Sequence, residues 1–456
     1  MQAIKQGLKR FLEGRIYIAL VMLLIFLGNT LSLDVPCALL LALMAISGFL
    51  LCDDLRFLIP PLCGFICIIP VSHTPYIPTE SDFYTTGALP YIIAVGSALL
   101  IGSLGVFIWR KRRAITPPAL RSSLLGGFIL FAVALALNGL FEPENKLRGL
   151  LYGLLLALSF LGVYLLFSLF HPRTEQNAEH FLLSMAALGI AVTAELLVLY
   201  ATRVRFEGFV PVKNDIMIGW GTWTQIGALL TVSLPCALSF ARKKKSWLLS
   251  MAGGAFIFLG IFLTASRGAW LYGGVLLLLS LLYLCFVGEA KKRTRVLCLV
   301  LLGAGLLVGV LLFDKLLSYL LAFMQVGFSD NGRFEIWGKA WDAFLRAPLF
   351  GTGFLNAGLS LGGFPEIMPY LYHNTLLQML ASSGLYGFVF YLFHRVETLR
   401  LAWRQRKSPV CVFLLLSAAA LVLVSLTDEH IFHIYPAFWY AIALSLAEGK
   451  YEKETP

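Results

Sequence analysis

The chain has 456 residues, of which 59% are hydrophobic and only 13% are charged. Soluble globular domains are roughly 45–50% apolar and about 25% charged, so this composition excludes an ordinary soluble domain and indicates a polytopic membrane protein. The formal net charge is +11, but the basic residues cluster on short connections between apolar runs, where anionic lipid is a sufficient partner and nucleic-acid binding is not expected.

Apolar runs recur along the whole sequence, and most approach the length of about 20 residues that a transmembrane helix needs. We expect an all-α fold with about fourteen such helices, within a range of about twelve to fourteen. The expected helices are 16–33, 35–51, 56–71, 91–109, 122–140, 149–170, 180–200, 218–240, 247–265, 269–288, 296–313, 375–399, 410–427 and 435–448. No small-residue cleavage site follows the basic residues 1–15, so we expect the first run to remain as a helix. The eight cysteines lie in or beside apolar runs, which indicates neither a disulfide framework nor a zinc site.

Basic clusters mark every second connection between these runs. They lie at 110–113, 242–245, 291–295 and 400–407. The positive-inside rule makes these connections cytoplasmic, together with both termini. They are short and carry no Walker-type loop, so a cytoplasmic nucleotide site is not expected.

Four parts follow from this topology. Residues 1–215 form an N-terminal transmembrane bundle, and 216–313 form helices that carry a Ser-Arg-Gly turn. Residues 314–374 form one long external loop, and 375–456 form the C-terminal transmembrane helices. Because the external loop is the largest polar stretch in an otherwise apolar chain, we expect the chemistry to lie there.

The external loop contains the pattern of one amphipathic helix. An apolar stripe recurs at helical spacing through Phe334, Trp337, Trp341, Phe344 and Leu345. Two acid-before-base pairs at i,i+4 spacing lie on its polar side, Glu335 with Lys339 and Asp342 with Arg346. Asp330 or Asn331 can cap this helix and Pro348 can end it. We expect the helix to lie along the outer leaflet with its aromatic face in the membrane interface.

Two arginines on the external side are unusual. Arg333 lies in the first turn of the expected helix, where the helix dipole disfavours a cation unless an anion binds there. Arg267 lies in the three-residue turn between two apolar runs, which holds its side chain at the membrane boundary. Each could equally anchor the protein to lipid headgroups, but together they fit a binding site for a lipid-linked phosphate.

His373 stands where the external loop returns to the membrane. A neutral imidazole there could take a proton from a hydroxyl near neutral pH, and Asn374 could orient the ring or a sugar. A lone histidine at an interface can also be structural. The two external arginines and the close-packing positions Gly384 and Gly387 favour a functional role.

These residues together resemble the bacterial O-antigen ligase and Wzy-type polymerase family. The resemblance covers roughly 220–430 and rests on short motifs in a shared order on one side of the membrane. The motifs are Ser266-Arg267-Gly268, Gly332-Arg333 with Trp337, Pro348 with Gly351-Thr352-Gly353, and His373-Asn374 with Leu376, Leu377, Gln378, Ser383-Gly384 and Gly387.

The resemblance implies a GT-C-like, inverting and metal-independent membrane glycosyltransferase that uses a glycan on undecaprenyl pyrophosphate as donor. It implies that Arg267 and Arg333 bind the pyrophosphate and that His373 is the base that activates the acceptor hydroxyl. No cofactor and no metal are implied. His373 follows a tyrosine where some ligases have another histidine, which leaves the acceptor open among a growing glycan, a lipid core and a protein.

Further residues complete the expected substrate-binding set or remain open. Beside Asn374, we expect Tyr372, Gln378, Arg203 and Arg205 to contact substrate, although the two arginines could equally face water or headgroups. Lys213, on the same external connection, could widen the anionic site, and Glu195 could line it from inside a span. The group Asp428, Glu429, His430 and His433 could bind a metal, contribute to the acceptor site or be solvated.

Other functions remain as alternatives. A protein O-oligosaccharyltransferase would belong to the same family, and a flippase for lipid-linked oligosaccharides would also be multispan. A flippase, however, would be expected to place polar residues at mid-membrane depth in two matching halves. A purely structural scaffold would leave the position of Arg333 unexplained. We therefore expect a polysaccharide polymerase or ligase at the bacterial cytoplasmic membrane, with polymerase slightly favoured.

Overall fold

The structure is a computed structural model of the chain. It describes residues 2–68, 87–114, 122–142, 146–207, 210–219, 221–287, 290, 292–311, 314, 333–355, 372–449 and 451. Within these residues the chain is almost entirely helical, and the expectation of an all-α membrane protein is confirmed. The expected loop cap at Asp330 or Asn331 lies outside the described residues.

The N-terminal half is a succession of α-helices joined by short helical turns. Its elements are α1 (Gln2–Leu12), α2 (Arg15–Thr30), α3 (Asp34–Leu51), η1 (Arg56–Leu58), α4 (Ile59–Cys63), α5 (Phe65–Ile68), α6 (Leu89–Lys111), η4 (Arg112–Ala114), α7 (Leu125–Asn138), η6 (Gly139–Phe141), α8 (Lys146–Ala157), the π-helical turn η7 (Leu158–Gly162), α9 (Val163–Phe170) and α10 (Glu175–Thr202).

The C-terminal half begins with a small hairpin and continues as helices. Its elements are β1 (Phe206–Glu207), β2 (Val210–Pro211), η8 (Lys213–Asp215), α11 (Trp223–Leu238), η9 (Ser239–Arg242), α12 (Trp247–Leu263), α13 (Arg267–Phe286), α14 (Lys292–Leu311), α16 (Arg333–Arg346), α18 (Thr375–Gln405), α19 (Pro409–Val424), η10 (His430–Phe432) and α20 (Ile434–Ala447). The two strands pair antiparallel, Phe206 with Pro211 and Glu207 with Val210.

Among the described residues, six helices are long and apolar enough to cross a membrane. They begin at Pro90, Lys146, Glu175, Trp223, Arg267 and Thr375. A seventh candidate is the pair Lys5–Leu12 and Arg15–Thr30, which bends by 67°, and shorter apolar helices occur at Val35–Leu51, Leu125–Phe141, Trp247–Leu263, Pro409–Val424 and Ile434–Ala447. The expected total of about fourteen and the GT-C class stay predictions.

The expected third span, 56–71, is not one helix in the structure. Its described part divides into η1, α4 and α5, because Pro60 and Pro61, in the first turn of α4, have no N–H to donate back to the preceding turn, and Gly64 ends α4. These short pieces are nevertheless buried, and the indole of Trp439 donates to the carbonyl of Cys63 across 2.8 Å. The segment therefore fills the centre of the bundle and does not span it alone.

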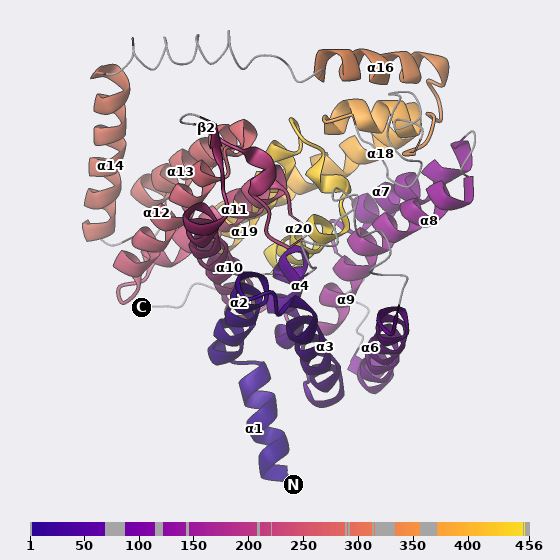
Figure 1. The fold of residues 1–456 in the computed structure, drawn as a ribbon, viewed down its shortest axis with the longest axis horizontal. Helices are drawn as coiled ribbons and strands as arrows, with labels where there is room; N and C mark the ends of the chain where they lie inside the picture. The colour runs from indigo at the N-terminus through magenta and orange to yellow at the C-terminus, as the bar shows by residue number, and fades with distance from the viewer. Residues whose placement is uncertain are drawn as a thin grey trace.

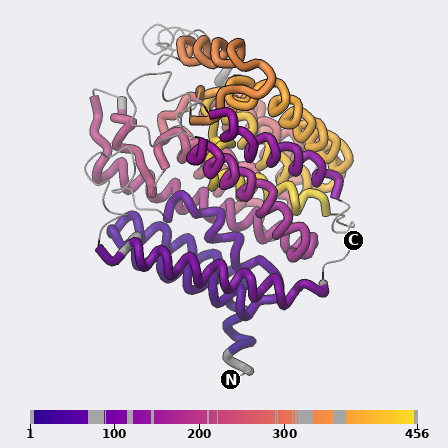
Figure 2. The backbone as a smooth tube through the Cα atoms, turned by 90° about the vertical axis from the view of Figure 1, so that its right-hand side faces the viewer, coloured from indigo at the N-terminus to yellow at the C-terminus, as the bar shows by residue number. Residues whose placement is uncertain are grey.

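The helix ends separate into two opposite faces of the bundle. At one face, Arg242 pairs with Glu175 and Glu179, and Arg173 pairs with Glu448, so the start of α10 and the ends of η9 and α20 lie together. The helix α16 lies across the opposite end of the molecule from α1 (Figures 1 and 2). Among the described residues, parts of the connections expected to be external lie together at the end with α16, since Lys213, Ser266, Arg333 and Asp428 line one cavity.

The helix α16 confirms the expected amphipathic element of the long loop. Ala340 and Ala343 are buried against α18, while Phe334, Trp341 and Leu345 stay exposed on the other side. Glu335 and Lys339 form the predicted pair, with 2.9 Å between their charged atoms. The second predicted pair is wrong, because Arg346 Nε donates to the main-chain oxygen of Asp342 and not to its carboxylate.

Candidate functional site

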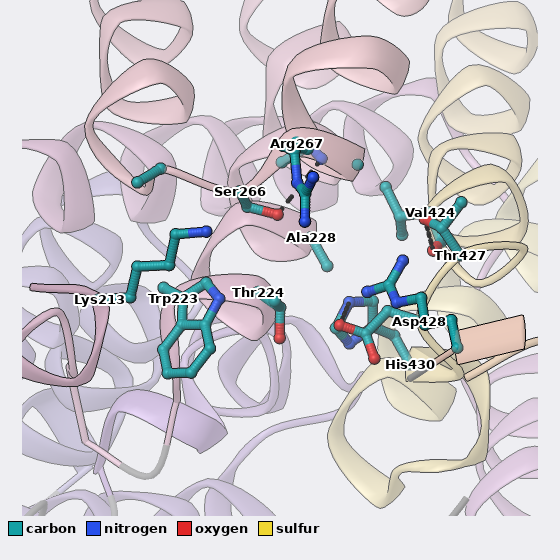
Figure 3. A pocket seen from close by; sticks show the side chains of 14 residues that line it. Lys213, Trp223, Thr224, Ala228, Ser266, Arg267, Val424, Thr427, Asp428 and His430 are labelled. Carbon is teal, nitrogen blue, oxygen red and sulfur yellow. Dashed lines mark hydrogen bonds and ion pairs between the residues drawn. The ribbon is translucent and has the colours of Figure 1, made fainter. Parts of the chain in front are cut away.

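A small polar cavity lies at the end of the bundle beneath α16. Its volume is about 60 Å³, enough for a few water molecules or a phosphate group but not for an oligosaccharide. Lys213, Arg267 and Arg333 line it together with Asp428 and His430. Lys213 and Arg267 point into it from one side, and Asp428 and His430 lie opposite (Figure 3). The two arginines singled out from the sequence therefore share one cavity.

Local helix geometry sets the position of Arg267. Ser266 caps α13, since its hydroxyl accepts from the main-chain N–H of Ala269. The preceding Ala265 has φ 52, so the chain turns sharply between α12 and α13. Arg267 is the first residue of α13 and lies where the unpaired N–H groups of the helix end favour an anion.

The electrostatics of the cavity favour an anionic ligand. Burial lowers the pKa of Lys213, and the positive charges of Arg267 and Arg333 lower it further. A lowered lysine pKa is the signature of a cation that is partly dehydrated and repelled by like charges. An anion among these three side chains would relieve that repulsion, and two guanidinium groups are well suited to phosphate oxygens.

His373 is linked to this cavity by its carboxylate partners. Its Nδ1 lies 2.8 Å from Oδ1 of Asp428 and 3.1 Å from Oε2 of Glu429. A carboxylate only accepts, so Nδ1 is the donor in these contacts. Asp428 also lines the cationic cavity, so it connects the histidine to the anion site.

The carboxylates make His373 strongly basic. Burial by itself would lower the pKa of His373, but the negative charges and hydrogen bonding of Glu429 and Asp428 outweigh it and raise the pKa to about 11. Burial raises the pKa of Asp428, but the neighbouring His430, His373 and Arg333 bring it well below its usual range. Both shifts describe an ion pair between the imidazolium of His373 and Asp428.

The residues on either side of His373 hold it in this position. Its backbone has φ 52, a left-handed conformation that costs roughly 1–2 kcal/mol for most residues and must be imposed by its surroundings. The main-chain N–H of Tyr372 donates to Oε1 of Gln378 across 2.7 Å. Asn374 caps α18 and donates to the carbonyl of Leu426, and Thr375 donates to the carbonyl of Ser425.

These bonds assign a structural use to three of the expected substrate-binding residues. Tyr372 and Gln378 are buried, and the amide of Gln378 also donates to the hydroxyl of Ser382 across 2.6 Å. Asn374 uses both ends of its amide for contacts within the protein. Substrate contact by these three residues stays a prediction, whereas their role in fixing the loop is observed.

Two glycines interlock the described part of the loop with α18. Gly384 has φ 62 and ψ −161 inside α18 and makes a kink there, and a Cβ at this residue would lie 2.5 Å from the carbonyl carbon of Leu349. Gly351, with φ 71, approaches the backbone of Ser382 in the same way. The main-chain N–H groups of Thr352 and Gly353 then donate to Ala381 and Ser382. The glycine motifs of the sequence therefore fasten residues 348–353 to the helix that begins beside His373.

A metal-compatible geometry occurs at a set of residues that overlaps the expected one. His373, Asp428 and Glu429 offer ligand atoms that all lie within 4.8 Å of one another. The sequence suggested Asp428 and Glu429 together with His430 and His433, and the structure places His373 with the two carboxylates instead of these two histidines. Burial lowers the pKa of both histidines despite the nearby carboxylates, and the ring of His433 stacks on Tyr435 with 5.8 Å between centroids.

Of the remaining sequence candidates, only Lys213 lines the cavity. Arg203 ends α10 and Arg205 forms a two-point ion pair with Asp215, and neither lines the cavity. Glu195 is buried inside α10 and does not line it either. Lys213 does line it, as the third cation. Substrate binding by Arg203 and Arg205 stays a prediction, and the contact that Arg205 makes with Asp215 gives it a structural use.

The sequence did not identify the orienting role of Asp428 and Glu429. From the sequence they were a possible metal or acceptor group, because nothing in the order of residues shows that 428–429 lie beside His373 in the fold. The available signal for this role was the acidic pair itself, which lies on a short connection expected to be external. That connection follows a helix that packs on α18.

Comparison with known proteins supports the resemblance seen in the motifs. Residues 252–392 match the family model described as O-antigen ligase. The matched segment contains Arg267, Arg333 and His373, whereas Lys213 and Asp428 lie outside it. A search of curated proteins gives no match.

Proposed function

We propose that this chain is a membrane glycosyltransferase, because residues 252–392 match the O-antigen ligase family model and the described residues include six helices long and apolar enough to cross a membrane. In this proposal it transfers a glycan from a polyprenyl pyrophosphate, such as undecaprenyl pyrophosphate, to an acceptor hydroxyl at the outer face of the bacterial cytoplasmic membrane. The observation that carries the proposal is that three cations line one cavity together with Asp428, the carboxylate that contacts His373.

The cations account for the donor end of the reaction. When the bond between the sugar and the pyrophosphate breaks, negative charge develops on the leaving pyrophosphate. Arg267, Arg333 and Lys213 would stabilise that charge without a divalent metal, since fixed cations in a partly dehydrated site are effective at this task. The cavity has room for phosphate but not for the glycan, so the sugars would lie outside it.

The His373 unit accounts for the acceptor end. Nδ1 of His373 is held by Asp428, and Nε2 would accept the proton of the acceptor hydroxyl as the new glycosidic bond forms. A base placed across the sugar from the leaving pyrophosphate gives inversion at the anomeric carbon. The pKa of about 11 makes the ring a strong base, although only a small fraction of it is neutral at pH 7.

The proposal for the donor has more support than any choice of acceptor. A polysaccharide polymerase would pass the glycan to another lipid-linked glycan, and a ligase would pass it to a lipid core. Protein O-glycosylation would use the same cavity with a serine or threonine as acceptor. We favour the polymerase or ligase reaction, because the matched family is described by glycan ligation.

Reconstitution tests this proposal. Purified protein in vesicles would receive a polyprenyl-pyrophosphate oligosaccharide and one candidate acceptor at a time, and the products would be separated by size. A ladder of longer lipid-linked glycans would identify a polymerase, and a single transfer to another acceptor would identify a ligase or an oligosaccharyltransferase. Movement of the donor across the bilayer with no new glycosidic bond would reject the proposal in favour of a flippase.

A further inference from the structure

A larger cavity lies at the face of the bundle opposite the candidate site. Its volume is about 690 Å³, within the usual range of roughly 300–1,000 Å³ for ligand sites. It is bounded by α10 on one side and by the start of α12 on the other, with Arg15 and Arg56 at its edge. The glycosyltransferase proposal makes no use of it.

The cavity is long and becomes apolar with depth. Its lining on α10 runs from Gln176 to Ile190 along a single helical face, a rise of about 21 Å at 1.5 Å per residue. Polar residues line the first turn and a half, and Leu183, Ala186, Ala187 and Ile190 line the remainder. A length of about 21 Å exceeds half of the roughly 30 Å hydrocarbon core, so the groove reaches through about one leaflet.

The shape of the groove follows from where α10 and α12 touch. Near the far end of the groove they approach closely, because a Cβ at Gly260 would lie 2.3 Å from Oγ1 of Thr193 and one at Gly189 would lie 2.8 Å from Cδ1 of Ile257. Nearer the basic clusters the facing residues are small, and Gly253 lines the groove itself. Leu249 lines it too and is exposed, so the groove opens sideways toward lipid.

The mouth of the groove is positively charged. Five cations and two carboxylates line it. Arg56 pairs with Glu13, and Lys243 pairs with Glu179. Arg15, Lys244 and Lys245 have no ion-pair partner among the residues that the structure describes, and the side chains of all three are exposed. Three cations therefore remain beside the entrance to an apolar groove.

We propose that this groove binds an anionic glycerophospholipid of the cytoplasmic leaflet. The phosphate would lie against Lys244, Lys245 and Arg15, and an acyl chain would lie along α10 beside Gly253. Only a ligand with one anionic end and a long apolar part uses both halves of the cavity, and basic pockets between helices on this side of a membrane are suited to such lipids. A soluble anion would leave the groove uncovered, and a neutral lipid would leave the charges unmatched.

The test is native mass spectrometry of the full-length protein in detergent, titrated with phosphatidylglycerol. Lys244→Gln with Lys245→Gln should weaken binding of the first lipid by roughly 30-fold, because each cation near a lipid phosphate contributes about a factor of five. Gly253→Leu should weaken it independently by filling the groove. The matched control is Lys292→Gln with Arg293→Gln, which removes two exposed cations from the start of α14, outside the groove. The control should bind as the wild type does.

Four outcomes would overturn the lipid site. Equal losses in the control would mean that binding follows general surface charge. Equal affinity of the wild type for phosphatidylcholine would remove the role of the cations. Unchanged lipid binding in Gly253→Leu would mean that no acyl chain enters the groove. The same would follow if inorganic phosphate competed for the site as strongly as a second lipid does. Circular dichroism melts of each variant separate a lost site from a lost fold, and the Gly253→Leu result stands even if the double lysine variant does not fold.

Discussion

Nδ1 of His373 donates a hydrogen bond to Oδ1 of Asp428 across 2.8 Å, and this bond joins two segments that lie 55 residues apart in the chain. One segment leads into α18 and the other follows α19. The main chain reinforces the junction, since Thr375 donates to the carbonyl of Ser425 from both its N–H and its hydroxyl. The proposed base is thus held by the loop between α19 and α20 as much as by its own.

Asp428→Asn should lower kcat by roughly 10²–10⁴-fold while leaving KM for the donor within a few-fold of wild type. An asparagine can still contact Nδ1, but it does not stabilise the imidazolium that forms when Nε2 takes a proton. Steady-state kinetics with the lipid-linked donor would measure both parameters. Asp428→Glu should recover part of the rate. A loss confined to KM would instead place Asp428 in donor binding.

The pH dependence of the rate should report the raised pKa of His373. Below a pKa of about 11, the neutral fraction of the ring rises tenfold with each pH unit, so kcat/KM should rise about tenfold per unit between pH 6.5 and 9. In Asp428→Asn the pKa falls, and the rise should level off at a lower pH. Reactions without enzyme correct for alkaline breakdown of the donor. A flat profile would show that the protonated ring, and not the neutral one, is the active form.

Arg267→Ala and Arg333→Ala should each lower kcat/KM by roughly 10²–10³-fold, since each removes a cation that lines the cavity proposed for the leaving pyrophosphate. The lysine variants should lose less, because charge is kept but two-point contact is not. The double alanine variant should lose less than the product of the single losses if both residues hold one ligand. Arg346→Gln, at the other end of α16, is the control and should remain near wild type. Near-wild-type rates for both alanine variants would remove the site assignment.

Gly384→Ala should destabilise the protein by roughly 1–3 kcal/mol, because φ 62 with ψ −161 is accessible almost only to glycine and the added Cβ meets Leu349. The measurement is thermal unfolding in detergent. Gly338→Ala is the matched control, since its Cβ would meet no atom within 4 Å and alanine favours the α16 helix. Equal melting temperatures for the two variants would contradict the proposed interlock.

Removal of divalent metals should leave the rate unchanged. His373, Asp428 and Glu429 present ligand atoms within 4.8 Å, yet the proposed mechanism uses them as a hydrogen-bonded unit. The enzyme would be dialysed against EDTA and assayed with and without added Mg²⁺, Mn²⁺ or Zn²⁺. A rate that falls on dialysis and returns with one ion would assign these three residues to a metal site.

The sequence was sufficient for the elements that depend on local pattern. The stripe of α16, the Glu335–Lys339 pair and the all-α class follow from periodicity and composition, and the structure confirms them. It was not sufficient where proline breaks an apolar run, as in 56–71, because hydropathy alone does not distinguish a buried broken segment from a span.

For the site, the sequence identified each cation as unusual by its local position but gave no distances between them. Arg203 and Lys213 were equally plausible contributors from one connection, and only the fold places Lys213 at the cavity. The partnership of His373 with Asp428 depends on how α18 packs beside α19, which is a tertiary contact without a local signature.

The walls of the cationic cavity come from residues between 213 and 228, from 265–269, from Arg333 and from residues between 424 and 430, and only 265–269 and Arg333 lie within residues 252–392. A fragment cut to that segment would keep Arg267, Arg333 and His373 but would lose Lys213 and the carboxylates that orient the histidine. Under the proposed function, exchange of the flanking stretches between relatives would replace one donor-binding cation and the groups that orient the base, while Arg267, Arg333 and His373 would be kept.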